Sequence, residues 1–154
     1  MTLVVDIPGG RRLELEHLVL DVNGTLSDRG ALLGGIRERA DRLRDLLELH
    51  LVSGDTFGTL DALAAELGLP ASRIATGEDK LELLERLGRE RCAVVGNGTN
   101  DALVLEAAAL GIAVVGPEGA SGAAVRSADV LCRSVLEALD LLLDTRALGA
   151  TLRP

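Results

Sequence analysis

The stretch HLVLDVNGTL at residues 17–26 decides the fold of this chain. Its first half, His17–Asp21, is an apolar run that ends in an acidic residue, the pattern of a strand buried in a parallel sheet. Gly24 follows closely and permits a tight turn and the close approach of a ligand to the backbone. The carboxylate of Asp21 is therefore predicted to project from a rigid strand into a crevice. The alternative is that Asn23-Gly24 forms only a hairpin turn, for which this dipeptide is a strong signal.

Outward from this stretch, apolar runs of strand length alternate with segments of helical periodicity. We expect a hairpin from residues 3–7 and 13–16 and a loop over residues 22–35. Further strands are expected at residues 49–53, 92–95, 112–115 and 128–131, with a short run at Ile74. Helices are expected at residues 36–47, 60–67, 81–87, 101–110 and 135–143, three of them closed by Gly68, Gly88 and Gly111. This alternation predicts the α/β class, a Rossmann-like parallel sheet with helices on both faces, as a single domain over residues 1–154.

Composition excludes several classes of protein. A chain of 154 residues with 47% hydrophobic content suits one folded domain. A net charge of −8 and a single aromatic residue, Phe57, argue against nucleic-acid binding. No apolar run reaches the ~20 residues that span a bilayer, and the first residues do not resemble a signal peptide, so we expect no membrane partner and a cytoplasmic location. Cys92 and Cys132 are expected to be buried free thiols.

The rare residue types need an explanation. Lys80 is the only Lys among sixteen basic residues, and Asn occurs only at positions 23, 97 and 100. A Lys offers a compact ammonium that a planar guanidinium does not mimic. The plain alternative is that Lys80 is a solvated helix charge and the Asn residues form turns. His17 and His50 lie at strand starts, away from the expected reactive edge, and are expected to be structural.

Three polar clusters follow strands: Asp21–Thr25, Ser53–Thr56 and Gly96–Asp101. Lys80 opens a helix between the second and the third. Because the carboxyl ends of parallel strands meet at one edge of the sheet, these groups are expected to converge there. They would supply a carboxylate nucleophile, a hydroxyl, an ammonium and hard oxygen ligands for Mg²⁺, which suits phosphoryl transfer. The second and third clusters also contain residues that cap helices, which is the structural alternative.

In this order, DVNGTL, Ser53, Lys80 and GNGTND resemble the four motifs of the haloacid dehalogenase (HAD) superfamily of phosphohydrolases. The phrases DVNGTL, VSGDT and VGNGTNDALVLEAAALGIAVVG are most similar to the phosphorylation domain of P-type ATPases, here without membrane or nucleotide-binding parts. The resemblance spans residues 13 to about 143. It implies a capless HAD-like fold in which residues 27–35 form a short flap in place of a cap domain.

The resemblance also implies a Mg²⁺-dependent mechanism through an aspartyl-phosphate. Asp21 would be the nucleophile, Lys80 would neutralise the phosphoryl group, and Asn23 would take part in catalysis. The implied phosphate-binding residues are Thr25, Ser53, Gly54 and Lys80, and the implied metal ligands are Asp21, the Asn23 main-chain carbonyl, Asn97 and Asp101.

Two departures from the family pattern bear on the rate. Asn23 stands where family phosphatases carry the Asp that acts as general acid and base. Asn97 stands where an acid usually binds Mg²⁺. We therefore expect a slow phosphohydrolase or phosphotransferase for a small phosphorylated substrate.

The main alternative is a degenerate, non-catalytic HAD domain that binds phosphate, a nucleotide or a protein partner. A phospho-receiver domain is disfavoured, because the acidic pair on its first strand and the Lys after its last catalytic strand are both missing. A homo-oligomer is expected by analogy with small capless relatives only. Residues 116–121 (GPEGAS) are either a substrate loop or a plain surface turn.

Overall fold

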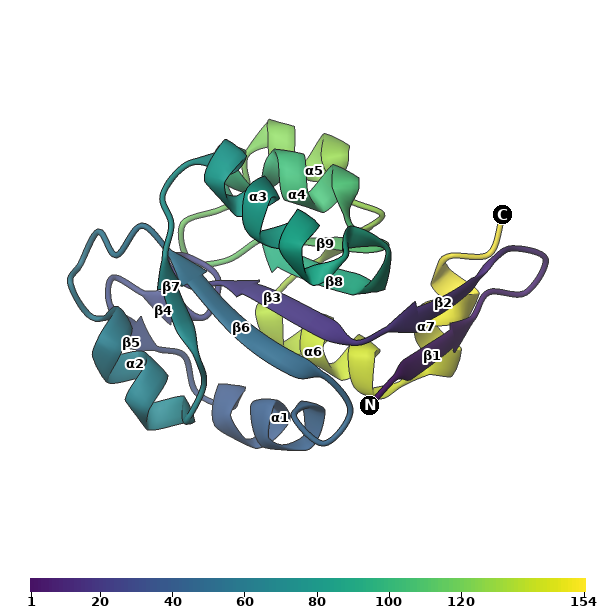
Figure 1. Ribbon diagram of the computed structural model, residues 1–154, viewed down its shortest axis with the longest axis horizontal. Helices are drawn as coiled ribbons and strands as arrows, with labels where there is room; N and C mark the ends of the chain where they lie inside the picture. Colours follow the sequence, from purple (N-terminus) through teal and green to yellow (C-terminus); the bar gives the residue numbers. More distant parts are fainter.

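The computed structural model describes residues 1–154, built around one six-stranded parallel sheet (Figure 1). The strand order is β10-β9-β8-β3-β6-β7, and every neighbouring pair is parallel. The strands are β3 (His17–Asp21), β6 (Glu48–Ser53), β7 (Ala71–Arg73), β8 (Cys92–Gly96), β9 (Leu110–Val114) and β10 (Val130–Cys132). The predicted α/β class is confirmed, and β3, the strand of the deciding stretch, lies inside the sheet.

Helices cover both faces of the sheet, as Figure 1 shows above and below β3. Those of one face are α1 (Ile36–Leu43), α2 (Leu60–Leu67) and α6 (Val135–Leu143). Those of the other are α3 (Gly77–Leu87), α4 (Ala102–Ala107) and α5 (Gly122–Ser127). Because successive strand residues point to opposite faces, Leu18 and Leu20 pack with the first group and Val19 with the second. Because helices cover both faces of the sheet, all three of these residues are buried, and this part of the strand is therefore apolar throughout.

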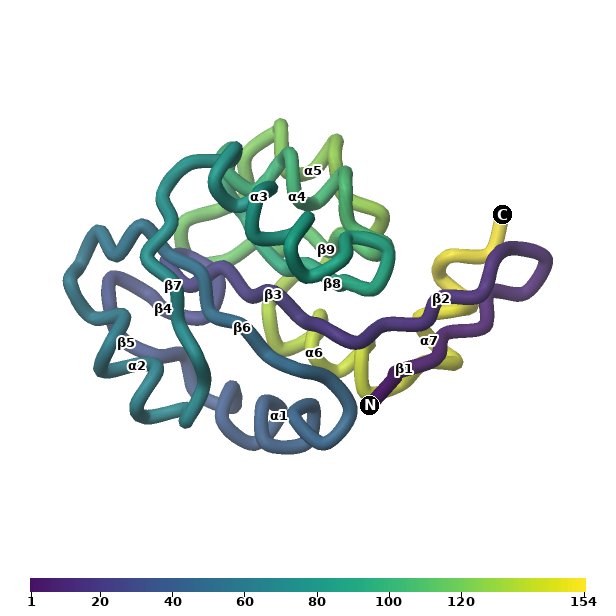
Figure 2. Tube along the Cα trace, viewed as in Figure 1, coloured from purple at the N-terminus to yellow at the C-terminus, as the bar shows by residue number.

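The predicted N-terminal hairpin is confirmed as β1 (Leu3–Asp6) and β2 (Arg12–Leu15), which pair antiparallel. It extends beyond the sheet and packs on a C-terminal helix, α7 (Thr145–Thr151) (Figure 2). The expectation that the helix ending at Leu143 is the last one is wrong. Asp144 caps α7 by accepting a hydrogen bond from the Ala147 N–H at 3.1 Å, and Leu148 is fully buried.

Two expectations around residues 101–127 are wrong. The helix expected over residues 101–110 is a single 3₁₀ turn, Thr99–Asp101, followed by α4, which ends at Ala107. Gly111 does not close it but lies in β9, where a Cβ atom would come within 2.2 Å of the Leu105 carbonyl oxygen, so a glycine lets α4 pack on the strand. Helix α5 was not expected, and Ser121 caps it through the Ala124 N–H.

Residues 22–35, expected to be a loop, contain a very short hairpin. Strands β4 (Ser27–Asp28) and β5 (Ala31–Leu32) pair antiparallel. Arg29 and Gly30 make the turn between them, both with positive φ. Helix α1 also ends at Leu43, four residues before the expected Leu47.

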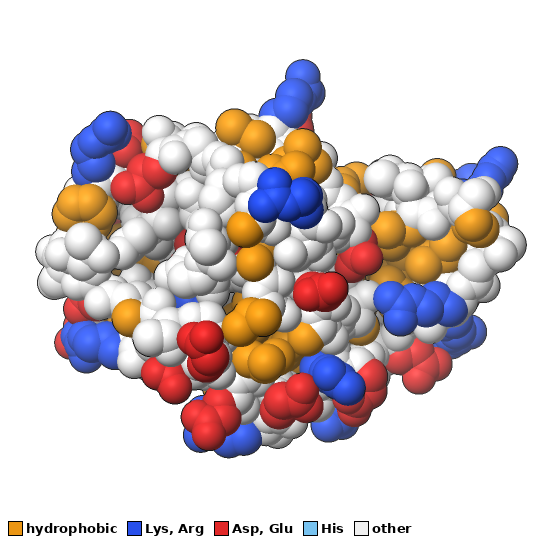
Figure 3. Space-filling model, turned by 90° about the horizontal axis from the view of Figure 1, so that it is seen from above, with side chains coloured by type: hydrophobic (Ala, Val, Ile, Leu, Met, Phe, Trp, Pro, Cys, Tyr) orange, Lys and Arg blue, Asp and Glu red, His pale blue; other side chains and the backbone are white.

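The expectation of buried free thiols is confirmed, since Cys92 and Cys132 are both buried and unpaired. None of the helices combines the length and the apolar character needed to cross a membrane. On the face seen in Figure 3, hydrophobic side chains lie in several separate groups with charged side chains between them. No partner surface is marked out there, and oligomerisation stays a prediction.

Candidate active site

The polar clusters follow three adjacent strands, β6, β3 and β8, at their carboxyl ends. The chain runs from β3 to β6 and β7 on one side, then crosses back to β8 and β9 on the other. This reversal makes β3 the switch point of the sheet, where the loops of neighbouring strands diverge and leave a crevice. Asp21 is the last residue of β3 and therefore lies at the base of that crevice.

Lys80 lies beneath Asp21 and joins it to the loop after β8. Its Nζ donates to Asp21 Oδ1 at 3.0 Å and to Asp101 Oδ1 at 2.7 Å. Thr76 caps α3 and so fixes the first turn, which carries Lys80. Only 4% of Lys80 is exposed, so the alternative of a solvated helix charge is wrong. A buried cation facing two buried carboxylates explains why an otherwise Arg-only chain has a Lys here, because an ammonium fits a space that the guanidinium fork would overfill.

The electrostatics of this trio follow from burial and charge. Burial, together with repulsion from the Asp101 carboxylate, raises the pKa of Asp21 to about 7, against the opposing effect of Lys80. Burial alone would lower the pKa of Lys80, but the carboxylates of Asp21 and Asp101 outweigh it and raise that pKa above its ordinary value. The ammonium therefore stays charged at neutral pH, and Asp21 titrates in the physiological range. Any cation bound against Asp21 would favour its carboxylate form.

Thr25 orients the nucleophile candidate rather than facing the crevice. Its hydroxyl is fully buried and lies 3.1 Å from Asp21 Oδ2 and 3.2 Å from Asn97 Oδ1. Since a hydroxyl has one proton, it donates to one of these oxygens at a time. The amide of Asn97 donates to the Gly119 carbonyl at 3.0 Å, so both ends of that side chain are engaged.

Asp101 anchors the loop after β8. Its Oδ2 accepts from the N–H groups of Asn97 and Gly98 at 3.1 and 3.0 Å, and its Oδ1 accepts from Lys80. A Cβ atom on Gly96 would lie 2.6 Å from the Asp101 carboxyl, so a glycine at the end of β8 makes room for it. In this structure Asp101 holds Lys80 and the loop and does not reach the crevice.

The crevice is a cavity of about 320 Å³. It is lined by Asp21, Asn23, Ser53, Gly54, Thr56, Ala75, Asn97, Gly98, Asn100 and Glu118. Among the expected site residues, Asp21, Asn23, Ser53, Gly54 and Asn97 face it. Thr25, Lys80 and Asp101 form the layer below. The lining is almost entirely polar, which suits a small charged ligand.

The loop after β6 is ordered by Asp55. Its two carboxylate oxygens accept from the Leu60 N–H at the start of α2 and from Arg73, each at 2.9 Å, and this bonding lowers its pKa. The capping interpretation therefore holds for Asp55. Ser53 differs, because it lines the cavity and its Oγ accepts from the Asp55 N–H at 2.9 Å, which leaves its own proton available for a ligand.

Residues 116–121 are part of the site rather than a plain surface turn. The Ser121 N–H donates to the Asn97 carbonyl at 2.8 Å, and a Cβ atom on Gly116 would lie 2.0 Å from the Gly24 carbonyl oxygen. Glu118 comes from this loop: a Cβ atom on Gly24 would fall 2.1 Å from its Oε2. In the sequence, the only signal for Glu118 is that it is an acidic residue in a glycine-containing loop shortly after a buried strand.

The groups facing the cavity fit a Mg²⁺ ion by their chemistry. The lining residues include the acids Asp21 and Glu118 and the amides Asn23 and Asn97, and they include no Cys or His. Mg²⁺ prefers oxygen ligands and is usually held by one or two carboxylates together with water and substrate phosphates.

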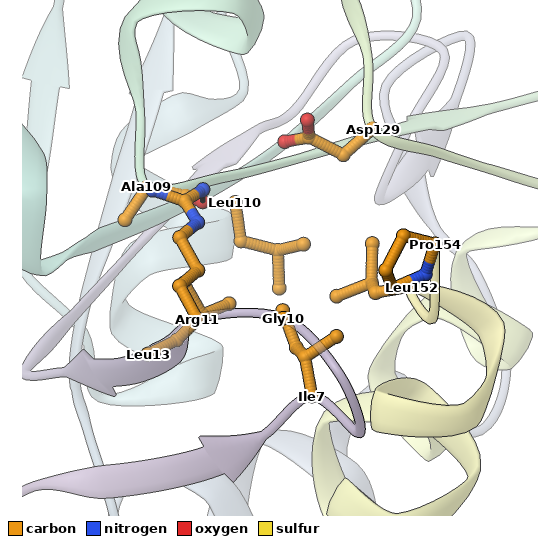
Figure 4. A pocket seen from close by; sticks show the side chains of 9 residues that line it. All are labelled: Ile7, Gly10, Arg11, Leu13, Ala109, Leu110, Asp129, Leu152 and Pro154. Atoms are coloured by element: carbon orange, nitrogen blue, oxygen red, sulfur yellow. Dashed lines mark hydrogen bonds between the residues drawn. The ribbon is translucent and has the colours of Figure 1, made fainter.

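A second cavity, of about 250 Å³, lies far from these motifs between the hairpin and the C-terminal segment (Figure 4). Ile7, Leu110 and Leu152 point into it, and Arg11 turns aside to donate to the Ala109 carbonyl at 2.7 Å. None of the motif residues lines it, so it offers no chemistry comparable to that of the crevice.

Comparison with known proteins agrees with this arrangement. The family model described as "haloacid dehalogenase-like hydrolase" matches residues 7–109. An uncharacterised protein of Methanocaldococcus jannaschii is 44% identical over 78 residues, which are 48% of this chain and 84% of that protein. The ATP-binding subunit of a potassium-transporting ATPase of Deinococcus radiodurans is 39% identical over 84 residues, which are 52% of this chain but only 12% of that subunit.

Solved structures share the fold. The cobalt-bound deoxy-D-mannose-octulosonate 8-phosphate phosphatase of Haemophilus influenzae superposes with a TM-score of 0.71 at 18% identity, over 86% of this chain and 90% of that one. The 3-deoxy-D-manno-octulosonate 8-phosphate phosphatase of Moraxella catarrhalis, solved with magnesium, phosphate and the sugar acid, gives 0.65 at 21% identity, over 85% and 87%. The family match and the sequence relatives thus confirm the resemblance to HAD proteins and to portions of P-type ATPase subunits, and the solved structures confirm the fold.

Proposed function

Because the chain belongs to the haloacid dehalogenase-like hydrolases, we propose that it is a Mg²⁺-dependent phosphohydrolase or phosphotransferase that works through an aspartyl-phosphate on Asp21. The observation that carries the proposal is the position of Asp21. Its carboxylate faces a polar cavity of about 320 Å³ while Lys80 and Thr25 hold it from below. A fixed carboxylate with a cation behind it is the arrangement that nucleophilic attack on a phosphoryl group requires.

In the proposed first step, an Asp21 oxygen bonds to phosphorus, the ester P–O bond breaks, and the leaving oxygen takes a proton from solvent water. In the second, water attacks the phosphorus and gives up a proton to solvent, the acyl-phosphate P–O bond breaks, and the Asp21 carboxylate and inorganic phosphate are released. The Ser53 hydroxyl and the main chain at Gly54 would hold phosphoryl oxygens, and Lys80 would balance their charge. Bound Mg²⁺ would supply charge neutralisation, held by Asp21, the Asn23 carbonyl and Asn97, with Asp101 behind them.

Asn23 makes the proposed enzyme slow. It lines the cavity two residues after Asp21, where an acid could protonate the leaving oxygen and later activate water. An amide does neither, because it does not titrate near neutral pH. General acid–base help is typically worth ~10²–10⁴-fold. The missing acid–base catalysis should slow turnover least for substrates with good leaving groups, such as acyl phosphates or a nucleotide γ-phosphate.

Residues 27–35 would act as a short flap, since Gly30 lies against Phe57 and Thr59 of the loop that follows Ser53. The proposed partner is a small phosphorylated substrate, and a second copy of the chain could complete the cavity mouth.

Phosphate release from a panel of phosphate esters tests the proposal. The panel should include the octulosonate 8-phosphate that the structural neighbours act on, ATP and an acyl phosphate. We expect Mg²⁺-dependent turnover that Asp21→Asn abolishes, and beryllofluoride with Mg²⁺ should protect wild type but not this variant from thermal unfolding. Turnover that survives in Asp21→Asn would refute the mechanism.

The non-catalytic alternative rests on one observation. The Asn97 side chain is hydrogen-bonded at both ends, to Thr25 and to the Gly119 carbonyl, so it would bind Mg²⁺ more weakly than a carboxylate at this position. A domain that only binds phosphate would take up beryllofluoride or phosphate and release none from any ester on the panel, including the acyl phosphate.

A further inference from the structure

We propose a second metal site, for Zn²⁺, formed by His17, His50 and Glu48 at the amino ends of β3 and β6. It is separate from the crevice: His17 and Asp21 are the two ends of β3, and four residues of strand span roughly 13 Å. The proposal does not depend on the phosphoryl-transfer function.

Sheet register brings the three residues to one face. His17 is paired with Glu48 across β3 and β6, which lie side by side in Figure 1, and His50 lies two residues beyond Glu48 on the same strand. Because strand side chains alternate between faces, residues two apart share a face, and all three side chains emerge on the same one. His17 and His50 are the only histidines of the chain.

The three ligand atoms converge. His17 Nδ1 lies 3.2 Å from His50 Nε2 and 3.3 Å from Glu48 Oε2, and His50 Nε2 lies 4.0 Å from the same Glu48 oxygen. A triangle of these sides has a point about 2.1 Å from all three corners, which is the bond length that zinc makes to imidazole nitrogen and carboxylate oxygen. The ring centroids are 5.3 Å apart, farther than the nitrogens, so the two rings converge on their nitrogens.

A plain hydrogen bond explains this geometry less well. If His17 Nδ1 carries the proton, that proton is divided between His50 Nε2 and Glu48 Oε2; if His50 Nε2 carries it instead, lone pairs of His17 Nδ1 and Glu48 Oε2 face each other across 3.3 Å. A cation at the common point instead engages one lone pair of each group.

The surroundings leave a coordination position open. Glu48 and His50 line a cavity of about 290 Å³ that is separate from the crevice. Two imidazoles, one carboxylate and a water from this cavity would give the four ligands that zinc prefers. The net charge of −8 favours cation binding in general, and the two imidazoles select a transition metal over Mg²⁺.

Co²⁺ and Zn²⁺ titrations of the full chain in millimolar Mg²⁺ test the site. Wild type should bind one equivalent of Co²⁺ with the intense visible absorption of a four-coordinate ion. Zn²⁺ should displace it and shift the ring resonances of both histidines. At about 100 times its Kd, Zn²⁺ should shift the folding equilibrium about 100-fold toward the folded state.

Variants separate this site from the crevice. Asp21→Asn should keep the Co²⁺ spectrum, whereas His50→Asn should lose it and Glu48→Gln should weaken binding about tenfold. Glu48 is 65% exposed in its side chain, so Glu48→Gln should fold normally, and Glu90→Gln, an exposed acid of the same charge, is the matched control. Absence of Co²⁺ binding by wild type, binding that is lost in Asp21→Asn, or binding that is equal in His50→Asn would overturn the proposal.

Discussion

Replacing Lys80 by methionine removes the only cation that touches Asp21 and Asp101, two carboxylates that are 8% and 1% exposed. Methionine fills a similar volume and leaves the backbone of α3 alone. The change therefore isolates the charge. Removing one partner of a buried ion pair costs about 3–5 kcal/mol, because the other charge is left buried without compensation.

The loss of unfolding free energy in Lys80→Met should increase as the pH rises. With the ammonium gone, the buried pair must hold at least one proton more than in wild type to stay folded, while the unfolded chain ionises near ~3.9. A group protonated in the folded state and ionised in the unfolded one costs about 1.4 kcal/mol for each pH unit above its unfolded pKa. The destabilisation should therefore grow by roughly 3 kcal/mol between pH 5 and pH 7.

Urea unfolding of wild type and Lys80→Met at these two pH values measures the effect. Lys80→Arg is the control: it keeps the charge but overfills the space, so it should lose about 1–3 kcal/mol without the added pH dependence. Asp101→Asn in the Lys80→Met background should recover stability at pH 7. A loss below 1 kcal/mol, or one that is equal at pH 5 and pH 7, would refute the assignment of Lys80 as the charge that holds this site together.

Three further predictions concern turnover. Asn23→Asp should speed dephosphorylation of the acyl-phosphate intermediate by ~10²–10⁴-fold, seen as loss of the burst of released carboxylate that wild type shows with an acyl phosphate; equal carboxylate bursts in both proteins would show that Asn23 does not slow this step. Glu118→Gln should raise the Mg²⁺ concentration for half-maximal activity by about threefold to tenfold, because losing one partly screened charge weakens Mg²⁺ binding by about 1 kcal/mol. Glu106→Gln, on the exposed side of α4, is the control and should leave that concentration unchanged. At Mg²⁺ far below saturation, kcat/KM should fall about tenfold per pH unit below pH 7, because the raised pKa of Asp21, about 7, then governs the fraction of carboxylate; a flat profile from pH 5 to pH 7 would contradict it.

The strands and the edge that carries the site could be predicted from the sequence for a physical reason. A strand buried on both faces must be apolar throughout, so β3 and β8 are readable as runs that stop at a polar residue. Asp21 and Asn97 mark those stops, and parallel topology then brings them to one edge. Lys80 could be predicted as a site residue from its rarity, since a single Lys in an Arg-rich chain indicates a position that needs an ammonium.

What could not be predicted depends on contacts between distant segments. Gly111 has the sequence signal of a helix end, yet its place is decided by the Leu105 carbonyl that packs against it. Helices α5 and α7 are six and seven residues long and rich in alanine, so they show no apolar periodicity. Glu118 lies seventeen residues beyond Asp101, the end of the last motif, and only the loop that folds back over Gly24 brings it to the cavity.

The pairing of the hairpin with α7 has a consequence for how the chain is made. Leu3 and Val5 of β1 and Leu148 of α7 are buried in the same cluster, and the whole parallel sheet lies between them in the sequence. Gly149 lets the Asp6 carbonyl approach so closely that no side chain would fit between them. During synthesis the hairpin therefore keeps an uncovered apolar side until α7 has emerged. Chains that stop before Thr145 should expose this side to chaperones and proteases, so α7 is the segment that protects the hairpin.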